Sequence, residues 1–214
     1  MTEAEWLQSP KPYPMLGFLH GKMDARRMRL FACACCRQVW PVLRDARSRK
    51  AVRKLEEFAD DLANTRLRRD AYNIANAAYS AMPYGRDGIS AAACTAVCAT
   101  YPDPFVCVLG NFDAALSESR GMNTAAIQQL EADLLRDIFG DLFRPITFAS
   151  EWRTETTVLL ARRMYEKCDF SAMPILADAL QDAGCDNDEV LNHCRADRVH
   201  ARGCWVVDAV LGKR

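Results

Sequence analysis

Apolar side chains recur at spacings of three and four residues along most of this chain, and this period limits its possible folds more than any other feature. From residue 28 to residue 43 the spacing joins Met28, Phe31, Cys35, Val39 and Leu43. Steps of three and four place side chains on one face of an α-helix, whereas strands require alternation. Residues 146–148 are the one place where we would allow a strand. We therefore predict an all-α, irregular bundle of about nine or ten helices without significant sheet.

Capping residues and breaks divide this pattern into separate helices. Thr2 followed by Glu5 has the pattern of a capping box, which satisfies the first backbone N–H groups of a helix. Three further N-caps are expected at Asp24, Ser48 and Asn123. Gly184 follows an apolar periodic segment and is expected to end that helix. Two short helices are then predicted, the first ending at Cys194 and the second beginning near Cys204.

The length of 214 residues allows one large helical domain or two smaller ones. An irregular segment, DLFRPITFAS, separates two groups of predicted helices. We therefore predict a main helical domain over residues 1–150 and a C-terminal helical subdomain over residues 151–214 that packs on it. A single continuous domain is the alternative.

The net charge of the chain is zero, but the charged residues are unevenly distributed. Residues 1–70 contain 15 Lys and Arg against 9 Asp and Glu, and the remainder contains 13 against 19. A net charge of zero argues against general nucleic-acid binding by bulk electrostatics. We expect the halves to attract each other within or between chains, or the basic part to bind a protein partner. Nucleic-acid binding through the basic N-terminal third is an alternative, although its arginines Arg26, Arg27 and Arg29 fit a solvated helix surface paired with nearby acids such as Asp60.

The first residues and the cysteine content bear on the compartment. The start of the chain lacks the basic and then apolar layout of a signal peptide, and no apolar run approaches the roughly 20 residues that span a bilayer. We therefore predict a cytoplasmic protein without a membrane partner, whose ten cysteines remain reduced. Cys33, Cys35 and Cys36 are expected to pack as small buried side chains within one helix.

A cluster of sulfur and imidazole groups near the end of the chain is the strongest candidate for chemistry. It comprises Cys185, His193, Cys194, His200 and Cys204. Zinc prefers four nitrogen or sulfur ligands in a tetrahedron, and the spacing of four from His200 to Cys204 suits a ligand pair. Neighbouring residues on a helix point about 100° apart, so His193 and Cys194 are alternative ligands. The pattern allows a Cys₂His₂ or Cys₃His zinc site, and the alternative is that these cysteines are core residues and no cofactor binds.

A reactive thiol is a third interpretation of the same residues. Cys204 precedes the last predicted helix, where the helix dipole and the neighbouring Arg202 would lower the pKa of its thiol. His200 would then act as the base, oriented by Asp197 or Asp208. The chain lacks a phosphate-binding glycine loop, a G-x-S-x-G elbow and an H-E-x-x-H helix. We therefore assign no catalytic residues and favour a non-enzymatic protein.

Several segments in order also carry a resemblance: MTEAEWL, PMLGFLHGK, RLFACACCRQVW, PILADALQDAGC and the tail HCR followed by HARGCWVVD. On these residues the chain resembles a family of uncharacterised proteins and modules of planctomycete-type bacteria, often present in many copies in one genome. No activity is established for that family. The resemblance implies a modular domain that stands beside interaction or regulatory domains, and we therefore favour a helical interaction module that binds a protein partner.

Overall fold

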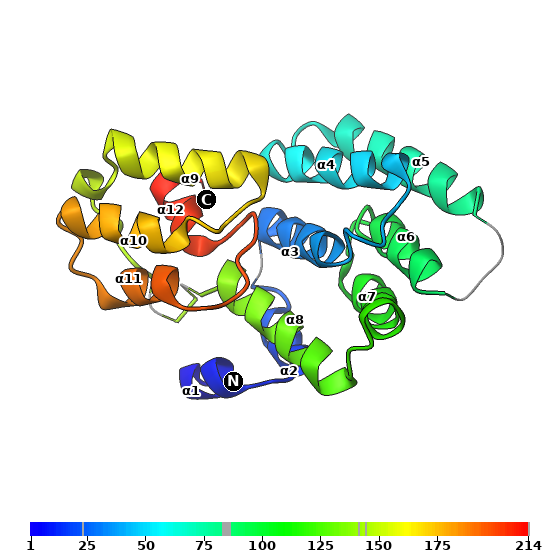
Figure 1. The fold of residues 1–214 in the computed structure, drawn as a ribbon, viewed down its shortest axis with the longest axis horizontal. Helices are drawn as coiled ribbons and strands as arrows, with labels where there is room; N and C mark the ends of the chain where they lie inside the picture. Colours follow the sequence, from blue (N-terminus) through cyan, green and yellow to red (C-terminus); the bar gives the residue numbers. More distant parts are fainter. Residues whose placement is uncertain (23, 83–86, 141, 144, 214) are drawn as a thin grey trace. The chain divides into compact units, whose positions relative to one another are not determined.

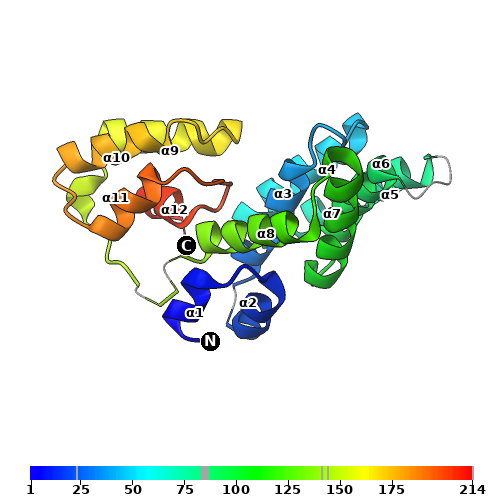
Figure 2. The same cartoon turned by 60° about the horizontal axis from the view of Figure 1, so that its bottom comes forward.

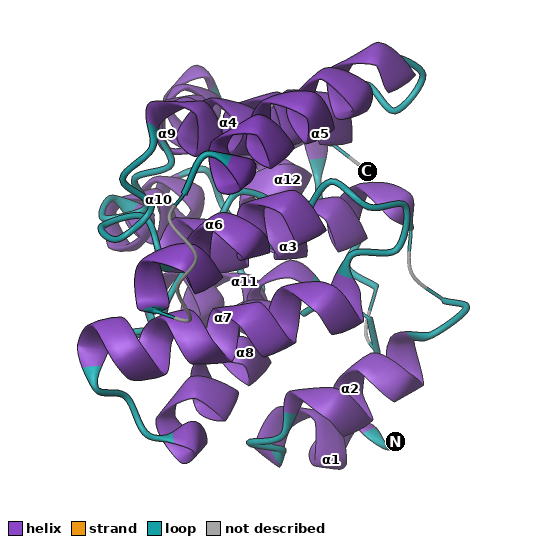
Figure 3. Ribbon diagram, turned by 90° about the vertical axis from the view of Figure 1, so that its right-hand side faces the viewer, coloured by secondary structure: helices purple, strands orange, loops and turns teal. Residues whose placement is uncertain are grey.

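The computed structural model describes residues 1–22, 24–82, 87–140, 142–143 and 145–213. Within these ranges the chain forms twelve α-helices, one short 3-10 helix and no strand, which confirms the all-α fold (Figure 3). Residues 146–148, where a strand was allowed, form a loop. The predicted count of nine or ten helices is too low. None of the helices in the described part of the chain has the length and hydropathy that a membrane crossing requires.

The chain divides into two compact units, residues 1–132 and residues 133–214. The division therefore lies within helix α8 (Thr124–Ile138), whereas the sequence predicted a boundary after residue 150. The last turn of that helix, with Asp137, contributes side chains to the second unit. We call the two parts the N-terminal unit and the C-terminal unit.

The N-terminal unit is built from seven helices and the first part of an eighth (Figure 1). These are α1 (Glu3–Gln8), α2 (Pro12–Leu19), α3 (Ala25–Gln38), α4 (Ala46–Asp60), α5 (Thr65–Ser80), α6 (Gly88–Cys98), α7 (Phe105–Arg120) and α8 (Thr124–Ile138). Helix α4 packs against α5, α6 packs against α7, and α3 contacts α4, α6 and α7. Helix α3 is therefore central, and Cys33, Cys35 and Cys36 are buried in it, which confirms their predicted packing role.

The helix caps follow the local sequence closely. Thr2 and Glu5 form the predicted capping box, and the carboxylate of Asp24 accepts a hydrogen bond from the backbone N–H of Arg27. The side chain of Asn123 likewise accepts from the N–H of Ala126 at the start of α8. The predicted cap Ser48 is instead buried inside α4, whose N-cap is Asp45. Asp45, three residues before Ser48, is the better N-cap because its negative charge also interacts favourably with the positive end of the helix dipole.

Two of the three arginines at the start of α3 are not solvated as predicted, although the predicted pairing with Asp60 is confirmed for Arg26. Arg26 and Arg29 are buried, at 7% and 5% exposure. The guanidinium of Arg26 lies 3.2 Å from a carboxylate oxygen of Asp60, and that of Arg29 donates to the backbone carbonyl of Ala99. The apolar stems of both arginines help to cover α3, while their head groups reach acceptors on other segments of the N-terminal unit.

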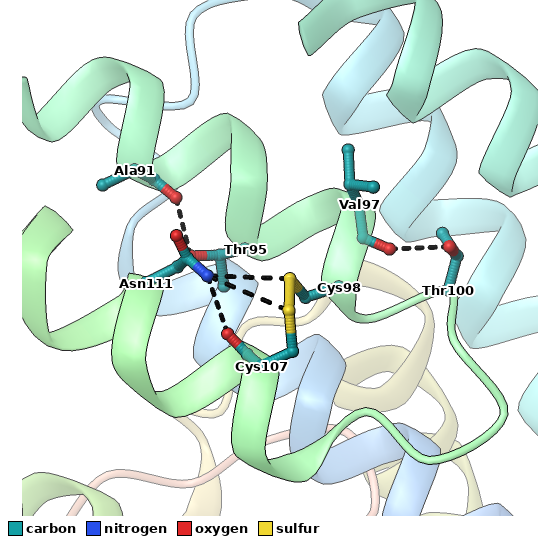
Figure 4. Close-up of a disulfide and its surroundings, with 7 residues drawn as sticks. All are labelled: Ala91, Thr95, Val97, Cys98, Thr100, Cys107 and Asn111. Atoms are coloured by element: carbon teal, nitrogen blue, oxygen red, sulfur yellow. Dashed lines mark hydrogen bonds between the residues drawn. A yellow bond between two sulfur atoms is a disulfide. The ribbon is translucent and has the colours of Figure 1, made fainter. Parts of the chain in front are cut away.

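A disulfide joins Cys98, the last residue of α6, to Cys107 in α7 (Figure 4). The six intervening residues outside the helices reverse the chain, so the end of one helix faces the start of the next, with 5.5 Å between the two Cα atoms. The side-chain amide of Asn111 donates to the carbonyl of Cys107 and lies 3.6 Å from the Cys98 sulfur. The prediction that all ten cysteines are reduced is therefore wrong for this pair.

The C-terminal unit has four helices after the last turn of α8 (Figures 1 and 2). They are α9 (Glu155–Lys167), α10 (Met173–Asp182), α11 (Asp188–Arg195) and α12 (Trp205–Leu211), preceded by a 3-10 turn, η1 (Ser150–Trp152). Helix α10 packs against α9 and α11, and α12 packs against α9 and α11. Their apolar faces meet in one buried cluster that includes Met164, Leu176, Leu180, Val190 and Val207. A set of four polar side chains is enclosed beside this cluster, and these side chains form the candidate site.

Candidate metal centre in the C-terminal unit

Four side chains of the C-terminal unit converge on one buried point: Asp137, His193, His200 and Cys204. Asp137 is in the last turn of α8, His193 is in α11, His200 follows α11 and Cys204 is the N-cap of α12. One potential ligand atom of each residue lies within 4.8 Å of those of the other three. We refer to these four residues as the Asp-His-His-Cys centre. Its members are almost inaccessible, with side-chain exposure of 0% for Asp137 and 6% and 4% for the two histidines.

A tight turn brings His200 and Cys204 to the same side of the chain. The backbone N–H of Cys204 donates to the carbonyl of Ala201 at 2.9 Å, which closes the four-residue turn. Gly203, the third residue of that turn, has a φ of 101°, in the left-handed region. A side chain strains the backbone in this conformation, and glycine adopts it freely. The sequence HARGC thus places an imidazole and a thiol together at the start of α12.

Substitution Gly203→Ala is therefore expected to destabilise the C-terminal unit by about 1–3 kcal/mol and to weaken metal binding at the centre. Thermal unfolding and metal titration measure the two effects. Gly184→Ala is the matched control, because Gly184 also has a positive φ, of 84°, and lies away from the centre after α10. If both substitutions change metal affinity equally, the turn has no specific role in positioning Cys204.

Asp137 holds the centre together through both carboxylate oxygens. Its Oδ2 accepts a hydrogen bond from the backbone N–H of Ala201 at 2.8 Å. Its Oδ1 lies 2.6 Å from Nδ1 of His200 and 3.2 Å from Nε2 of His193. The backbone contact fixes the orientation of the carboxylate, so Oδ1 remains directed at the two rings. A single carboxylate oxygen is thereby presented to the middle of the centre.

The thiol of Cys204 faces the same two nitrogens. Its Sγ lies 3.2 Å from Nε2 of His193 and 3.9 Å from Nδ1 of His200. In a tetrahedral zinc site, adjacent ligand atoms are separated by about 3.3 Å for nitrogen and oxygen and about 3.6 Å for nitrogen and sulfur, given the usual bond lengths. Three of the four measured separations are within a few tenths of an ångström of these values. The contact of Asp137 with His200 is shorter and would open slightly around an ion.

The electrostatics of the centre favour a divalent cation. Burial alone would raise the pKa of Asp137, but hydrogen bonds from His193 and His200 outweigh this effect and hold its pKa at about 2. Burial lowers the pKa of His193, so its imidazole is neutral at physiological pH. A divalent metal ion bound by one carboxylate, one thiolate and two neutral imidazoles would give a total charge of zero. Neutrality matters here because an unbalanced charge in an enclosed site is costly.

The thiol of Cys204 is not activated in the way that its position before α12 predicted. Burial raises its pKa well above the usual value, and the nearby charge of Asp137 raises it further. The backbone N–H groups of Val206 and Val207 at the start of α12 lower the pKa as predicted, but burial outweighs them, so the predicted net lowering is wrong. A bound cation would supply the charge that stabilises the thiolate.

The contacts do not have the arrangement of a Cys-His-Asp relay. Such a relay requires the thiol at one imidazole nitrogen and the carboxylate at the other. Here Asp137 and Cys204 both face Nε2 of His193, and both also face Nδ1 of His200. Asp137 also occupies the position expected for Asp197 or Asp208. Ligand atoms that converge from four sides suit coordination of one ion better than proton transfer along a chain.

The structure brings three of the five predicted ligands together and leaves two outside. His193, His200 and Cys204 belong to the centre, whereas Cys185 and Cys194 are buried in the apolar cluster of the C-terminal unit. Burial raises the pKa of Cys194 to about 12, as expected for a small core side chain. Sequence reasoning missed Asp137. The sequence signal that could have identified Asp137 is its position on the apolar face of a predicted helix, between the buried Leu134 and Ile138.

The Asp-His-His-Cys centre can therefore hold one metal ion through two nitrogen, one oxygen and one sulfur ligand. Every one of these side chains comes from the C-terminal unit, so that unit contains the complete set. In comparisons with known proteins, no family model, no curated protein and no solved structure matches the chain. The functional interpretation therefore depends on the geometry of the centre itself.

Proposed function

We propose that the C-terminal unit is a non-enzymatic helical module stabilised by one zinc ion bound to Asp137, His193, His200 and Cys204. The observation that carries this proposal is the convergence of four buried potential ligand atoms within 4.8 Å of one another. Burying polar groups this close together costs free energy unless they form hydrogen bonds with each other or bind an ion. A structural metal ion offsets that cost and links segments that are distant in the sequence.

The ligand types support zinc over the alkaline-earth ions. Calcium and magnesium prefer six or more oxygen ligands or retain several water molecules. A set of two imidazoles, one thiolate and one carboxylate suits a borderline-soft ion with tetrahedral coordination, which describes zinc. The earlier prediction of a Cys₂His₂ or Cys₃His site is thus replaced by an Asp-His-His-Cys site, in which Asp137 takes the place of a second cysteine.

The enclosure of the centre supports a structural role. Catalytic zinc sites retain an open position for water or substrate, whereas structural sites use four protein ligands. Here the four side chains come from α8, α11, the following loop and α12, so a bound ion would tie these segments together. The role of the stabilised helices is to present a surface to a protein partner, as the modular resemblance implies. Because the HCR and HARGCW segments contain three of the four ligands, we extend the proposal to that bacterial family.

Metal analysis of the purified protein tests the proposal directly. The protein kept under reducing conditions is expected to contain close to one equivalent of zinc per chain, and less than about 0.2 equivalents after reconstitution would contradict the proposal. His200→Ala is expected to lose the ion. Cys194→Ala is the matched control, because Cys194 is buried in the C-terminal unit but does not belong to the centre.

Cobalt substitution separates loss of a ligand from loss of the fold. Cobalt(II) in a tetrahedral site with a thiolate ligand gives visible absorption and a sulfur-to-metal charge-transfer band. Cys204→Ser is expected to remove the charge-transfer band while the helical circular dichroism persists. Retention of that band in Cys204→Ser would mean that another sulfur binds the metal, and Cys194→Ala would then identify it.

A further inference from the structure

Trp205 contacts the centre from outside and makes a hydrogen bond that bears on metal loading. It is the first residue of α12, directly after Cys204, and it is 6% exposed. Its indole Nε1 donates to Nδ1 of His193 at 3.0 Å, and the two ring centroids are 5.0 Å apart. His193 therefore has Trp205 at one nitrogen and Asp137 with Cys204 at the other.

This contact fixes the position of the proton on His193. An indole nitrogen can donate a hydrogen bond but cannot accept one, so Nδ1 of His193 must carry the lone pair. A neutral imidazole has a single ring proton, which must then be on Nε2. That nitrogen is the one that faces Asp137 and Cys204 at 3.2 Å each. Trp205 thus selects the tautomer in which the ligand nitrogen of His193 is protonated.

On the basis of the proposed zinc site, we propose that Trp205 opposes metal loading by holding His193 in the tautomer that cannot bind the ion. Coordination through Nε2 needs its lone pair, so the Nε2 proton leaves to solvent and Nδ1 takes up one proton. His193 remains neutral. His200, whose Nδ1 donates to Asp137, must likewise give up its Nδ1 proton and take one up on Nε2, so the net release is the single proton of the Cys204 thiol. The protonated Nδ1 of His193 then faces the indole N–H, and because both groups are donors, the hydrogen bond to Trp205 breaks.

The surroundings of Trp205 restrict how its indole can respond. A Cβ atom added to Gly140 would lie 2.4 Å from Nε1 and 2.5 Å from Cδ1 of the indole, which shows how closely the ring approaches this backbone. Metal-ligating histidines usually donate their second N–H to a carboxylate or carbonyl, which strengthens the site. His193 instead has a competing donor at that position. Metal loading therefore requires the indole to move away from Nδ1.

Zinc affinity of Trp205→Phe compared with the wild-type chain tests the inference. Phenylalanine keeps an aromatic ring against the cluster but lacks the N–H, so the substitution removes one of the two contacts that favour the proton on Nε2, and the contact with Asp137 remains. We expect the dissociation constant, measured by competition with a chromophoric chelator, to fall about five- to tenfold, the worth of one hydrogen bond. Trp152→Phe is the matched control, because Trp152 packs on the same apolar cluster away from His193, and it should leave the affinity unchanged.

A second measurement needs no substitution. Nitrogen-15 NMR of the histidine rings in the wild-type chain reports which nitrogen is protonated. We expect His193 to carry its proton on Nε2 without metal and on Nδ1 with zinc; a proton on Nδ1 without metal would overturn the inference. Equal or weaker zinc binding by Trp205→Phe would also overturn it and would leave the zinc site standing. If neither protein binds zinc, the proposed function fails, and the role of Trp205 fails with it.

Discussion

Replacement of Asp137 by alanine is expected to destabilise the C-terminal unit by about 3–5 kcal/mol, the usual cost of removing one partner from a buried charged network. The substitution leaves the backbone N–H of Ala201 and the ring nitrogens of His193 and His200 without their common acceptor. It also removes one ligand and the negative charge from the Asp-His-His-Cys centre. Hydrogen exchange measured by mass spectrometry should show faster exchange in peptides from residues 133–214.

Two further variants separate the contributions of Asp137. Asp137→Asn retains an oxygen that can accept the hydrogen bond from Ala201 but lacks the charge, so it should keep more stability than alanine while losing metal. Asp178→Ala removes an aspartate of the same unit that is 73% exposed, and it should have little effect. If Asp137→Ala behaves like Asp178→Ala, the buried network does not stabilise this unit.

The same carboxylate gives an expected pH dependence. The folded pKa of Asp137 is about 2, below its ordinary value of 3.8. A group whose pKa is lower in the folded state contributes stability that is complete above its unfolded pKa and is lost as the pH falls through the folded value. The contribution of Asp137 should therefore be constant above about pH 4 and decline between about pH 4 and pH 2. Asp137→Asn should lack this acid-dependent step.

The all-α fold could be predicted because local signals decided it. Spacings of three and four, together with caps at Thr2, Asp24 and Asn123, agree with the helices that form. The short helices α1, α11 and α12 were expected as well, although they are only six, eight and seven residues long. Helices this short are marginal alone, so tertiary packing fixes them more than their own periodicity.

The candidate site was predictable only where its residues are neighbours in sequence. His193, His200 and Cys204 lie close together along the chain, and their residue types suggested a metal site. Asp137 is 63 residues from His200, and no local pattern links the two. The same limit applies to Cys98 and Cys107, whose pairing depends on how α6 and α7 pack. Cys185 and Cys194 fit the ligand spacing, but the apolar cluster takes their side chains, because a thiol serves equally well as a small core group.

Glu131 in the N-terminal unit gives the second large expected effect, a loss of stability as the pH rises. Its side chain is fully buried in α8, and neither carboxyl oxygen has a hydrogen-bond donor among the described residues. Burial, together with the smaller effect of the nearby charge of Asp113 in α7, raises the pKa of Glu131 to about 9. Glu131 is therefore protonated and uncharged at neutral pH, beside the carboxyl group of Asp113.

The sign of the effect follows from the two pKa values. In the unfolded chain Glu131 has its ordinary pKa of 4.5, so the folded state holds the proton more tightly. Its contribution to stability is fully present below about pH 4.5 and is lost progressively as the pH rises to about 9. One proton changes the free energy of unfolding by about 1.4 kcal/mol per pH unit, so roughly 3 kcal/mol should be lost from about pH 5.5 to 8.

Glu131→Gln is expected to remove this pH dependence and to stabilise the N-terminal unit at about pH 8 by up to roughly 5 kcal/mol. The amide has the same shape and remains neutral at every pH, so folding no longer requires the chain to bind a proton there. Urea unfolding of both proteins at a series of pH values measures the slope, and hydrogen exchange assigns it to residues 1–132. Glu57→Gln, at an exposed position of α4, is the control for removal of a charge. Equal slopes for Glu131→Gln and the wild-type chain would mean that Glu131 is ionised in the folded state, which would then require a buried cation beside it.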